Sequence, residues 1–266
     1  MPVDNVTVPF TLAHAAAALP FRRWHLVPSA LVIGTFAPDF EYLLRLSPRG
    51  RFGHTLVGSF VFTLPLALAV LWIFHSFVKR PAAMLLPEAI QRRLQDHLDE
   101  FRFGGVARFI LITASILLGI ATHLLWDSFT HSTAWPYHHW LLLRRSFALP
   151  IVGSLPLYKI FQHGSTVLGL SILSIWLLRW YRTTEPCGPL TRTLSLRRKA
   201  AVIALVVTVA LVGATTRALV GVGMTNGRFV LNKFVVQSVV TAMALVWWQL
   251  VAYGLAFRAV VRECQI

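Results

Sequence analysis

The sequence predicts an all-α fold, a polytopic transmembrane helical bundle of about five spans preceded by short, broken or re-entrant N-terminal helices. The chain has 266 residues, of which 56% are hydrophobic and only 13% are charged. A water-soluble domain of this length rarely has so apolar a composition. Apolar stretches of about 20 residues, the length needed to cross a hydrocarbon core, recur along the chain. Basic residues lie in the loops between them.

Two apolar pieces precede the full spans. "TLAHAAAAL" ends at Pro20, and "PSALVIGTFAPDFEYLL" is interrupted by Pro38 and Asp39. Broken helices are tolerated at membrane depth only where protein or a water-filled cavity surrounds them. We therefore expect both pieces to pack inside the bundle.

The predicted spans cover residues 56–78, 105–127, 159–180, 200–221 and 234–257. Between the first two, "LPEAIQRRLQDHLDEFRFGG" is amphipathic and ends at two glycines, which indicates an interfacial loop helix. We expect residues 1–266 to form a single integral-membrane domain. Within it, 1–180 is the motif-bearing part with a metal site, and 181–266 adds two further spans.

A formal charge of +15 can indicate nucleic-acid binding, but here the basic residues lie in short loops between apolar runs, where membrane topology and anionic lipid explain them. We therefore expect a multi-pass protein of the cell membrane. If the first span exits to the cytoplasm, the inner loops 79–108 and 179–199 each hold six basic residues. Cytoplasmic loops are typically enriched in lysine and arginine, which also attract anionic lipid. We expect a bacterial inner-membrane protein with lipid as its partner and no nucleic acid.

Polar residues gather at one membrane face when the spans alternate in direction. His54 opens the first span, His123 to His131 close the second, and the third opens at Lys159. Ionisable residues in membrane segments are costly and usually have a partner, a cavity or an ion. The predicted metal-binding residues are His14, Asp39, His54, His123, Asp127 and His131.

The run "THLLWDSFTH" places His123, Asp127 and His131 at intervals of four. Residues four apart on a helix rise about 6 Å and share a face, so neighbouring members can share an ion. His123 and His131 lie about 12 Å apart along a continuous helix. Either Asp127 bridges two ions, or His131 folds back after a helix that stops at Thr130. Imidazole and carboxylate donors suit zinc, with manganese as the alternative divalent metal.

Structural explanations compete with each of these assignments. His14 could bond a backbone carbonyl, Asp39 could begin a helix, and His54 could be an interfacial polar residue. The run from His123 to His131 could be a buried hydrogen-bonded network. Three further residues are expected in a second shell or in substrate binding. These are Glu41, Lys159 and His163.

Five motifs stand out together along the chain: "PFTLAH" (9–14), "APDFEYLL" (37–44), "GHTLVGS" (53–59), "THLLWDSFTH" (122–131) and "LPLYKIFQHGSTVLG" (155–169). With these motifs the sequence resembles the bacterial membrane family named domain of unknown function 4184. It covers about the first 180 residues. The order His, Asp, His and then HxxxD is also distantly similar to inner-membrane proteins described as metal-dependent hydrolases and to zinc-dependent phospholipase C. That similarity implies that His14, Asp39, His54, His123 and Asp127 are metal ligands. The chain lacks the downstream HxxxE pair of the soluble enzymes.

We therefore expect a membrane-embedded, metal-dependent hydrolase of a phosphoester or lipid-linked substrate, with its site at the outer face. A basic residue such as Lys159 or Arg144 would hold the substrate, and no residue stands out as the general acid. The alternative is a non-enzymatic transporter or assembly factor whose cluster is a proton or ion relay. A purely structural network is the third hypothesis.

Overall fold

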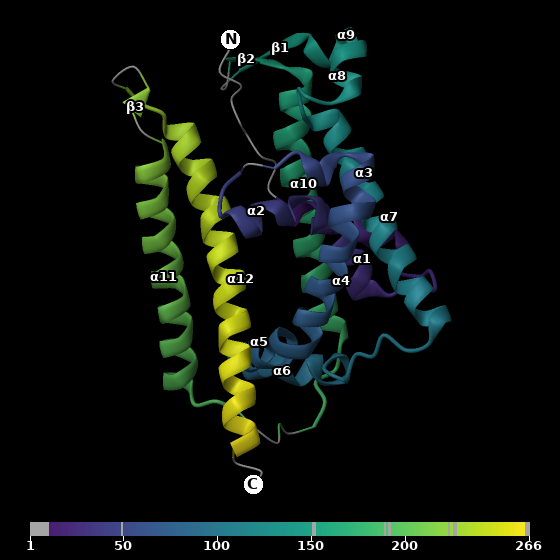
Figure 1. Ribbon diagram of the computed structural model, residues 1–266, viewed down its shortest axis with the longest axis vertical. Helices are drawn as coiled ribbons and strands as arrows, with labels where there is room; N and C mark the ends of the chain where they lie inside the picture. Colours follow the sequence, from purple (N-terminus) through teal and green to yellow (C-terminus); the bar gives the residue numbers. More distant parts are fainter. Residues whose placement is uncertain are drawn as a thin grey trace.

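The computed structural model describes residues 11–48, 50–150, 153–188, 190, 193–222, 224–225 and 228–263. The described chain is predominantly helical and includes two small two-stranded sheets (Figure 1). The predicted all-α fold class is confirmed. Of the motif at 9–14, Pro9 and Phe10 lie outside the described residues.

Short helices form the N-terminal part and lead into the first span. They are η1 (Thr11–Phe21), α1 (Pro28–Phe36), η2 (Ala37–Asp39), α2 (Phe40–Arg45), η3 (Phe52–His54), α3 (Leu56–Gly58), η4 (Ser59–Thr63), α4 (Leu64–Ile73), η5 (Phe74–Val78) and α5 (Lys79–Leu85). The remaining elements are α6 (Glu88–Leu94), η6 (Gln95–His97), α7 (Val106–Thr130), α8 (Trp135–His139), α9 (Leu141–Arg144), β1 (Ser146–Leu149), β2 (Gly153–Pro156), α10 (Leu157–Thr183), α11 (Leu196–Val222), β3 (Met224–Thr225), β4 (Arg228–Phe229) and α12 (Leu231–Glu263).

Five helical stretches are long and apolar enough to cross a membrane, as the sequence predicts. They cover Leu56–Leu85, Val106–His139, Leu157–Thr183, Leu196–Gly221 and Leu231–Val260. Four of them include their predicted spans and extend beyond them at one end or both, and the second begins at Val106, one residue later than predicted, and extends beyond residue 127. Successive stretches run in alternating directions through the bundle (Figure 1).

The first span is not a uniform α-helix. π-Helical turns at η4 and η5 precede Pro65 and Pro81 within a few residues. A proline removes one backbone donor and collides with the carbonyl four residues earlier, so the helix widens locally to accommodate it. The carbonyl four residues before Pro81 belongs to Phe77, and a Cβ at Gly254 of α12 would lie 1.9 Å from that oxygen. Glycine at 254 thus lets α12 approach the widened turn.

The broken N-terminal helices pack inside the bundle, as expected. Helix α1 lies against α7, where Gly34 and Gly119 face each other closely. A Cβ at Gly34 would lie 2.3 Å from the Ile116 carbonyl oxygen. This glycine contact lets the backbones of the two helices touch. It also brings the α1–α2 break, which contains Asp39, beside the C-terminal half of α7.

The loop between the first two spans differs from the expected single amphipathic helix. Helix α6 ends at Leu94, one 3-10 turn follows, and residues 98–105 are irregular before α7 begins. Side chains of α5, the helix before α6, bind this irregular backbone. Lys79 and Arg80 donate to the carbonyls of Asp99 and Leu98, at 2.5 and 2.8 Å.

Helices α11 and α12 form a hairpin beside the rest of the bundle, and α2 extends across to them (Figure 1). Polar side chains of the hairpin bind the last carbonyls of α2. The Leu46 carbonyl accepts bonds from Arg217, Gln237 and Thr241 at 2.8–3.0 Å. Leu46 has φ +49°, the left-handed conformation common just after a helix. These donors satisfy backbone groups that would otherwise be unpaired at the helix end.

Candidate metal centre

Five of the predicted ligands converge in one cluster, although they come from separate elements. His14 lies on η1, Asp39 ends η2, and His54 ends η3, while His123 and Asp127 lie one turn apart on α7. His14 and His123 are almost completely buried, and Asp39 is 7% exposed. We call these five residues the histidine–aspartate cluster.

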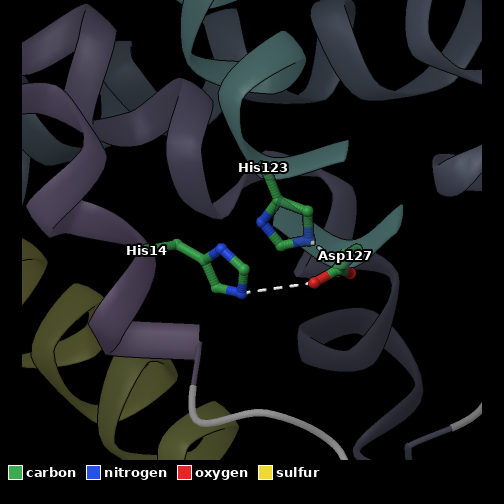
Figure 2. Close-up of side chains that lie close together, drawn as sticks. All are labelled: His14, His123 and Asp127. Carbon is green, nitrogen blue, oxygen red and sulfur yellow. Dashed lines mark ion pairs between the residues drawn. The ribbon is translucent and has the colours of Figure 1, made fainter. Parts of the chain in front are cut away.

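Asp127 lies between the imidazoles. Its Oδ1 is 3.5 Å from Nε2 of His14, and its Oδ2 is 3.2 Å from Nε2 of His123 and 3.6 Å from Nε2 of His54. Figure 2 shows His14 and His123 pointing toward this carboxylate. Their rings stack with centroids 4.1 Å apart.

Asp39, at the end of η2, faces two of these imidazoles, those of His54 and His123. Its Oδ1 is 3.3 Å from Nε2 of His54 and 3.8 Å from Nε2 of His123. Its other oxygen accepts a 2.6 Å hydrogen bond from the Thr11 hydroxyl. Because Thr11 occupies Oδ2, the carboxylate is oriented with Oδ1 toward the histidines.

The backbone fixes which nitrogen of His123 can accept a ligand. Nδ1 lies 2.8 Å from the Thr35 carbonyl oxygen, which can only accept a hydrogen bond. In the neutral ring the proton therefore sits on Nδ1 and the lone pair on Nε2. That lone pair points at oxygens of Asp127 and Asp39, which are also electron-rich. A positive charge, either a proton or a metal ion, must lie between them for the arrangement to be favourable.

The spacing of the donor atoms suits an ion. Zn²⁺ in a tetrahedral site binds nitrogen and oxygen at about 2.0–2.2 Å, which places ligand atoms about 3.4 Å apart. The four distances that join His54 and His123 to the two carboxylates range from 3.2 to 3.8 Å. Three of them exceed the usual length of an N–H···O hydrogen bond. Nε2 of His123 and Oδ1 of Asp127 are buried, and neither has a hydrogen-bond partner among the described residues.

The donors form two sets, and within each set the ligand atoms all lie within 4.8 Å of one another. One contains His14, His123 and Asp127, and the other contains Asp39, His54 and His123. His123 belongs to both, yet Thr35 leaves it a single free nitrogen. Two ions therefore cannot both bind His123. Two ions fit only if Asp127 bridges them, because its Oδ1 faces His14 and its Oδ2 faces His54 and His123.

His131 lies at the edge of the cluster. Helix α7 ends at Thr130, and His131 follows in extended conformation. Its Nδ1 lies 3.6 Å from Oδ1 of Asp127 and 3.2 Å from both the Asp127 carbonyl oxygen and the Thr130 hydroxyl. Because the helix ends at Thr130, the His131 side chain can turn back toward Oδ1 of Asp127. His131 belongs to neither of the two donor sets.

Burial and charge shift the titration of cluster residues outside the spans. Burial, with the neighbouring His123, lowers the pKa of His14 to about 4. Burial alone would lower the pKa of His54, but the Asp127 and Asp39 carboxylates raise it to about 10. Burial opposes ionisation of Asp39, and His123 and His54 nevertheless lower its pKa. Without an ion the cluster thus favours ionised Asp39 beside protonated His54.

The other predicted site residues have different surroundings. Glu41 is buried and pairs with Arg45 one turn later, at 2.9 Å. Lys159 Nζ is 3.4 Å from Oε1 of Gln162, and His163 is exposed on α10. Gln162 is 2% exposed. Arg144 donates to the carbonyls of residues 137 and 138 in α8.

Two supporting residues escaped the sequence reasoning. The Thr11 hydroxyl orients Asp39, and the Thr35 carbonyl orients His123. Thr11 stands three residues before His14 in "TLAH", and a hydroxyl near a candidate ligand is too common to single out. The Thr35 contact uses the backbone, so its side-chain identity carries no signal.

The fold and the cluster define a class, multi-pass helical membrane proteins with a buried histidine–aspartate cluster near one end of the bundle. Within this class the chain belongs to the family described as domain of unknown function DUF4184, whose model matches residues 8–255. The match extends beyond the first 180 residues that carry the motifs, across the fourth span and most of the fifth. The comparisons with curated proteins and with solved structures found no match.

Proposed function

We propose that this protein is a metal-dependent hydrolase that cleaves a phosphoester bond in a membrane lipid or lipid-linked substrate. The observation that carries the proposal is the orientation of His123. Its Nδ1 bonds the Thr35 carbonyl, so the lone pair on Nε2 faces Oδ1 of Asp39 and Oδ2 of Asp127. A purely hydrogen-bonded network would place a donor against each acceptor. Here Nε2 of His123 and Oδ1 of Asp127 have none among the described residues.

Zinc is the metal that we expect, with manganese as the alternative, because imidazole nitrogen and carboxylate oxygen suit both ions. Asp39, His54, His123 and Asp127 would hold the ion, with His14 on the other side of Asp127. A bound divalent ion would supply Lewis-acid chemistry, polarising the phosphoryl group and lowering the pKa of water. The cluster itself orients the donors and keeps bulk water away from the buried side.

The resemblance in motif order supports hydrolysis, and the position of the cluster supports an amphiphilic substrate. His54 is 23% exposed, so the cluster can be approached from its side. Leu56 and Val57, at the start of the first span, are 76% and 64% exposed next to it. An apolar surface beside a polar site suits a substrate whose acyl or prenyl chain stays in the bilayer while its headgroup enters. We place the site at the outer face of the bacterial inner membrane, from the distribution of basic loops.

Metal content and turnover test the proposal together. The full chain would be purified in detergent, its zinc and manganese measured by mass spectrometry, and hydrolysis of a nitrophenyl phosphodiester and of a headgroup-labelled phospholipid followed. We expect near-stoichiometric metal, and at least about tenfold less metal affinity and activity in H123A and D127N. The matched control is H139A, because His139 is exposed and its hydrogen bond within the described part of the chain is to the Trp135 carbonyl of its own helix.

Each other result selects a different reading. Metal without hydrolysis of either substrate would favour a non-enzymatic ion site, such as that of a transporter. A folded wild-type protein without metal would favour a proton relay or a packing network. Equal loss in H139A would trace the effect to general instability.

A further inference from the structure

A second polar site lies at the opposite end of the bundle from the histidine–aspartate cluster. A cavity of about 380 Å³ opens where α5, the irregular segment 99–101 and the C-terminal part of α12 meet. In Figure 1 these elements lie at the end of the bundle near the C-terminus. Helix α8 and the C-terminal end of α7 lie at the opposite end of the bundle. Its volume falls in the usual range of small-molecule sites.

Two guanidinium groups from different spans line the cavity. Arg80 lies five residues before the end of the first spanning stretch, and Arg258 lies two residues before the end of the last. None of the ion pairs between described residues involves either arginine. Arg80 Nε donates to the Leu98 carbonyl, and the Arg258 guanidinium lies 4.8 Å from the centroid of the Phe77 ring. The nearby backbone and ring therefore hold the two cations in place.

The other charges around the cavity leave an excess of positive charge. Glu100 pairs with Arg102 at 3.2 Å, so its carboxylate already has a cationic partner. Asp99 is the other carboxylate on the wall, and Lys79 donates to its backbone carbonyl. With Lys79 and Arg102, which contact the wall residues Asp99 and Glu100, the cations Arg80 and Arg258 bring four positive charges against two carboxylates.

Aromatic and apolar surface completes the wall. Phe101 and Phe257 line the cavity, and Phe101 stacks on His75 with ring centroids 4.0 Å apart. A ligand that fits this lining has a negatively charged oxygen group for the arginines and an apolar part for the rings. Because both arginines lie at the ends of membrane-spanning helices, that ligand is available in the bilayer itself.

We propose that this cavity binds the phosphate headgroup of an anionic phospholipid in the leaflet opposite the histidine–aspartate cluster. Arginine binds phosphate through paired N–H groups with defined geometry, and basic pockets between transmembrane helices are known to hold lipid headgroups. The inference is independent of the proposed hydrolase activity, since it uses none of the cluster residues.

Native mass spectrometry of the full chain in detergent tests it. Phosphatidylglycerol would be titrated into wild type, R80Q and R258Q, with R182Q as the matched control. Arg182 is exposed near the end of α10 and does not line the cavity. A basic residue near the membrane surface contributes about 1 kcal/mol to anionic-lipid binding, so each cavity substitution should weaken it about fivefold. R182Q should bind as wild type does.

Two comparisons identify the source of the phosphate. Phosphatidylcholine should bind more weakly than phosphatidylglycerol, and millimolar inorganic phosphate should not displace the lipid. Equal binding of both lipids, displacement by inorganic phosphate, or unchanged binding in R258Q would overturn the proposal, as would equal weakening in R182Q. Because Arg80 also holds the Leu98 carbonyl, R258Q decides the matter if R80Q unfolds.

Discussion

At the scale of single residues, the contacts outside the donor set determine what the cluster can bind. The Thr35 carbonyl accepts a hydrogen bond from Nδ1–H of His123, which leaves Nε2 free to bind an ion. Asp39 presents one oxygen because the Thr11 hydroxyl donates to the other. Such supporting contacts commonly change metal affinity by 10- to 100-fold, roughly, when removed. The sequence showed the donors and not these partners.

Replacing Thr11 by valine tests this dependence without touching a ligand. Valine is similar in shape and lacks the hydroxyl, so the Asp39 carboxylate should rotate more freely. We expect zinc affinity to fall by about 10- to 100-fold, measured by competition with a chromogenic chelator. T183V is the control, because the Thr183 hydroxyl donates to the Arg179 carbonyl of its own helix and not to a cluster residue. Unchanged affinity in T11V would show that the hydroxyl does not orient Asp39.

At the scale of elements, close helix contacts place the ligands. Helices α1 and α7 touch through glycines, and this contact sets the distance from Thr35 to His123. Helix α2, which follows Asp39 directly, is capped at its other end by side chains of α11 and α12. Arg217 and Trp248 donate to the carbonyls of Arg45 and Leu43. The last two spans contribute no cluster residue, yet they hold the helix that begins beside Asp39.

G34A should disrupt the contact between α1 and α7. The added methyl group would lie 2.3 Å from the Ile116 carbonyl oxygen, so the helices must separate. We expect overpacking to lower stability by about 1–3 kcal/mol, seen as a lower midpoint in thermal unfolding in detergent. G164A is the control, since a Cβ there meets nothing within 4 Å. Alanine favours helix over glycine, so G164A should unfold no earlier than wild type.

Removing the cap of α2 should weaken metal binding from a distance. Q237L deletes the donor to the Leu46 carbonyl, 2.8 Å away, while every cluster residue stays in place. We expect a drop in zinc affinity smaller than that of T11V, because Arg217 and Thr241 still hold the same carbonyl. Q249L on the same helix is the control, since Gln249 donates to α11 instead. Equal zinc affinity in the two variants would contradict the coupling.

At the scale of the whole molecule, the alternation of five spans separates two polar regions. The histidine–aspartate cluster lies toward one end and the arginine-lined cavity toward the other. Their separation does not depend on which end faces the cytoplasm. It follows from the order of the spans, since residues that close one span and open the next share a side.

Cysteine labelling tests this topology. In a background with Cys187 and Cys264 changed to serine, S132C and S195C should lie on opposite sides of the membrane. Ser132 follows α7, and Ser195 precedes α11. With the orientation inferred from the basic loops, a membrane-impermeant maleimide should label S132C in intact cells and S195C only after permeabilisation. Labelling of both from one side would refute the alternation.

The sequence alone determined the helical class, the five spans and the break at Pro38 and Asp39. These follow from local properties, because apolar length and proline act wherever they occur. It also indicated that His54, His123 and Asp127 share a face. The irregular backbone after α6 was missed, because the bonds from Lys79 and Arg80 that hold it come from an earlier helix.

The tertiary structure alone decided how the donors meet. Atomic distances between η1, η2, η3 and α7 depend on the glycine contact of α1 with α7 and on the capping of α2, which join residues far apart in the chain. The Thr35 carbonyl and the Leu46 carbonyl act through the backbone, which every residue has. A pattern of side chains can therefore name the ligands, while their orientation depends on packing between helices.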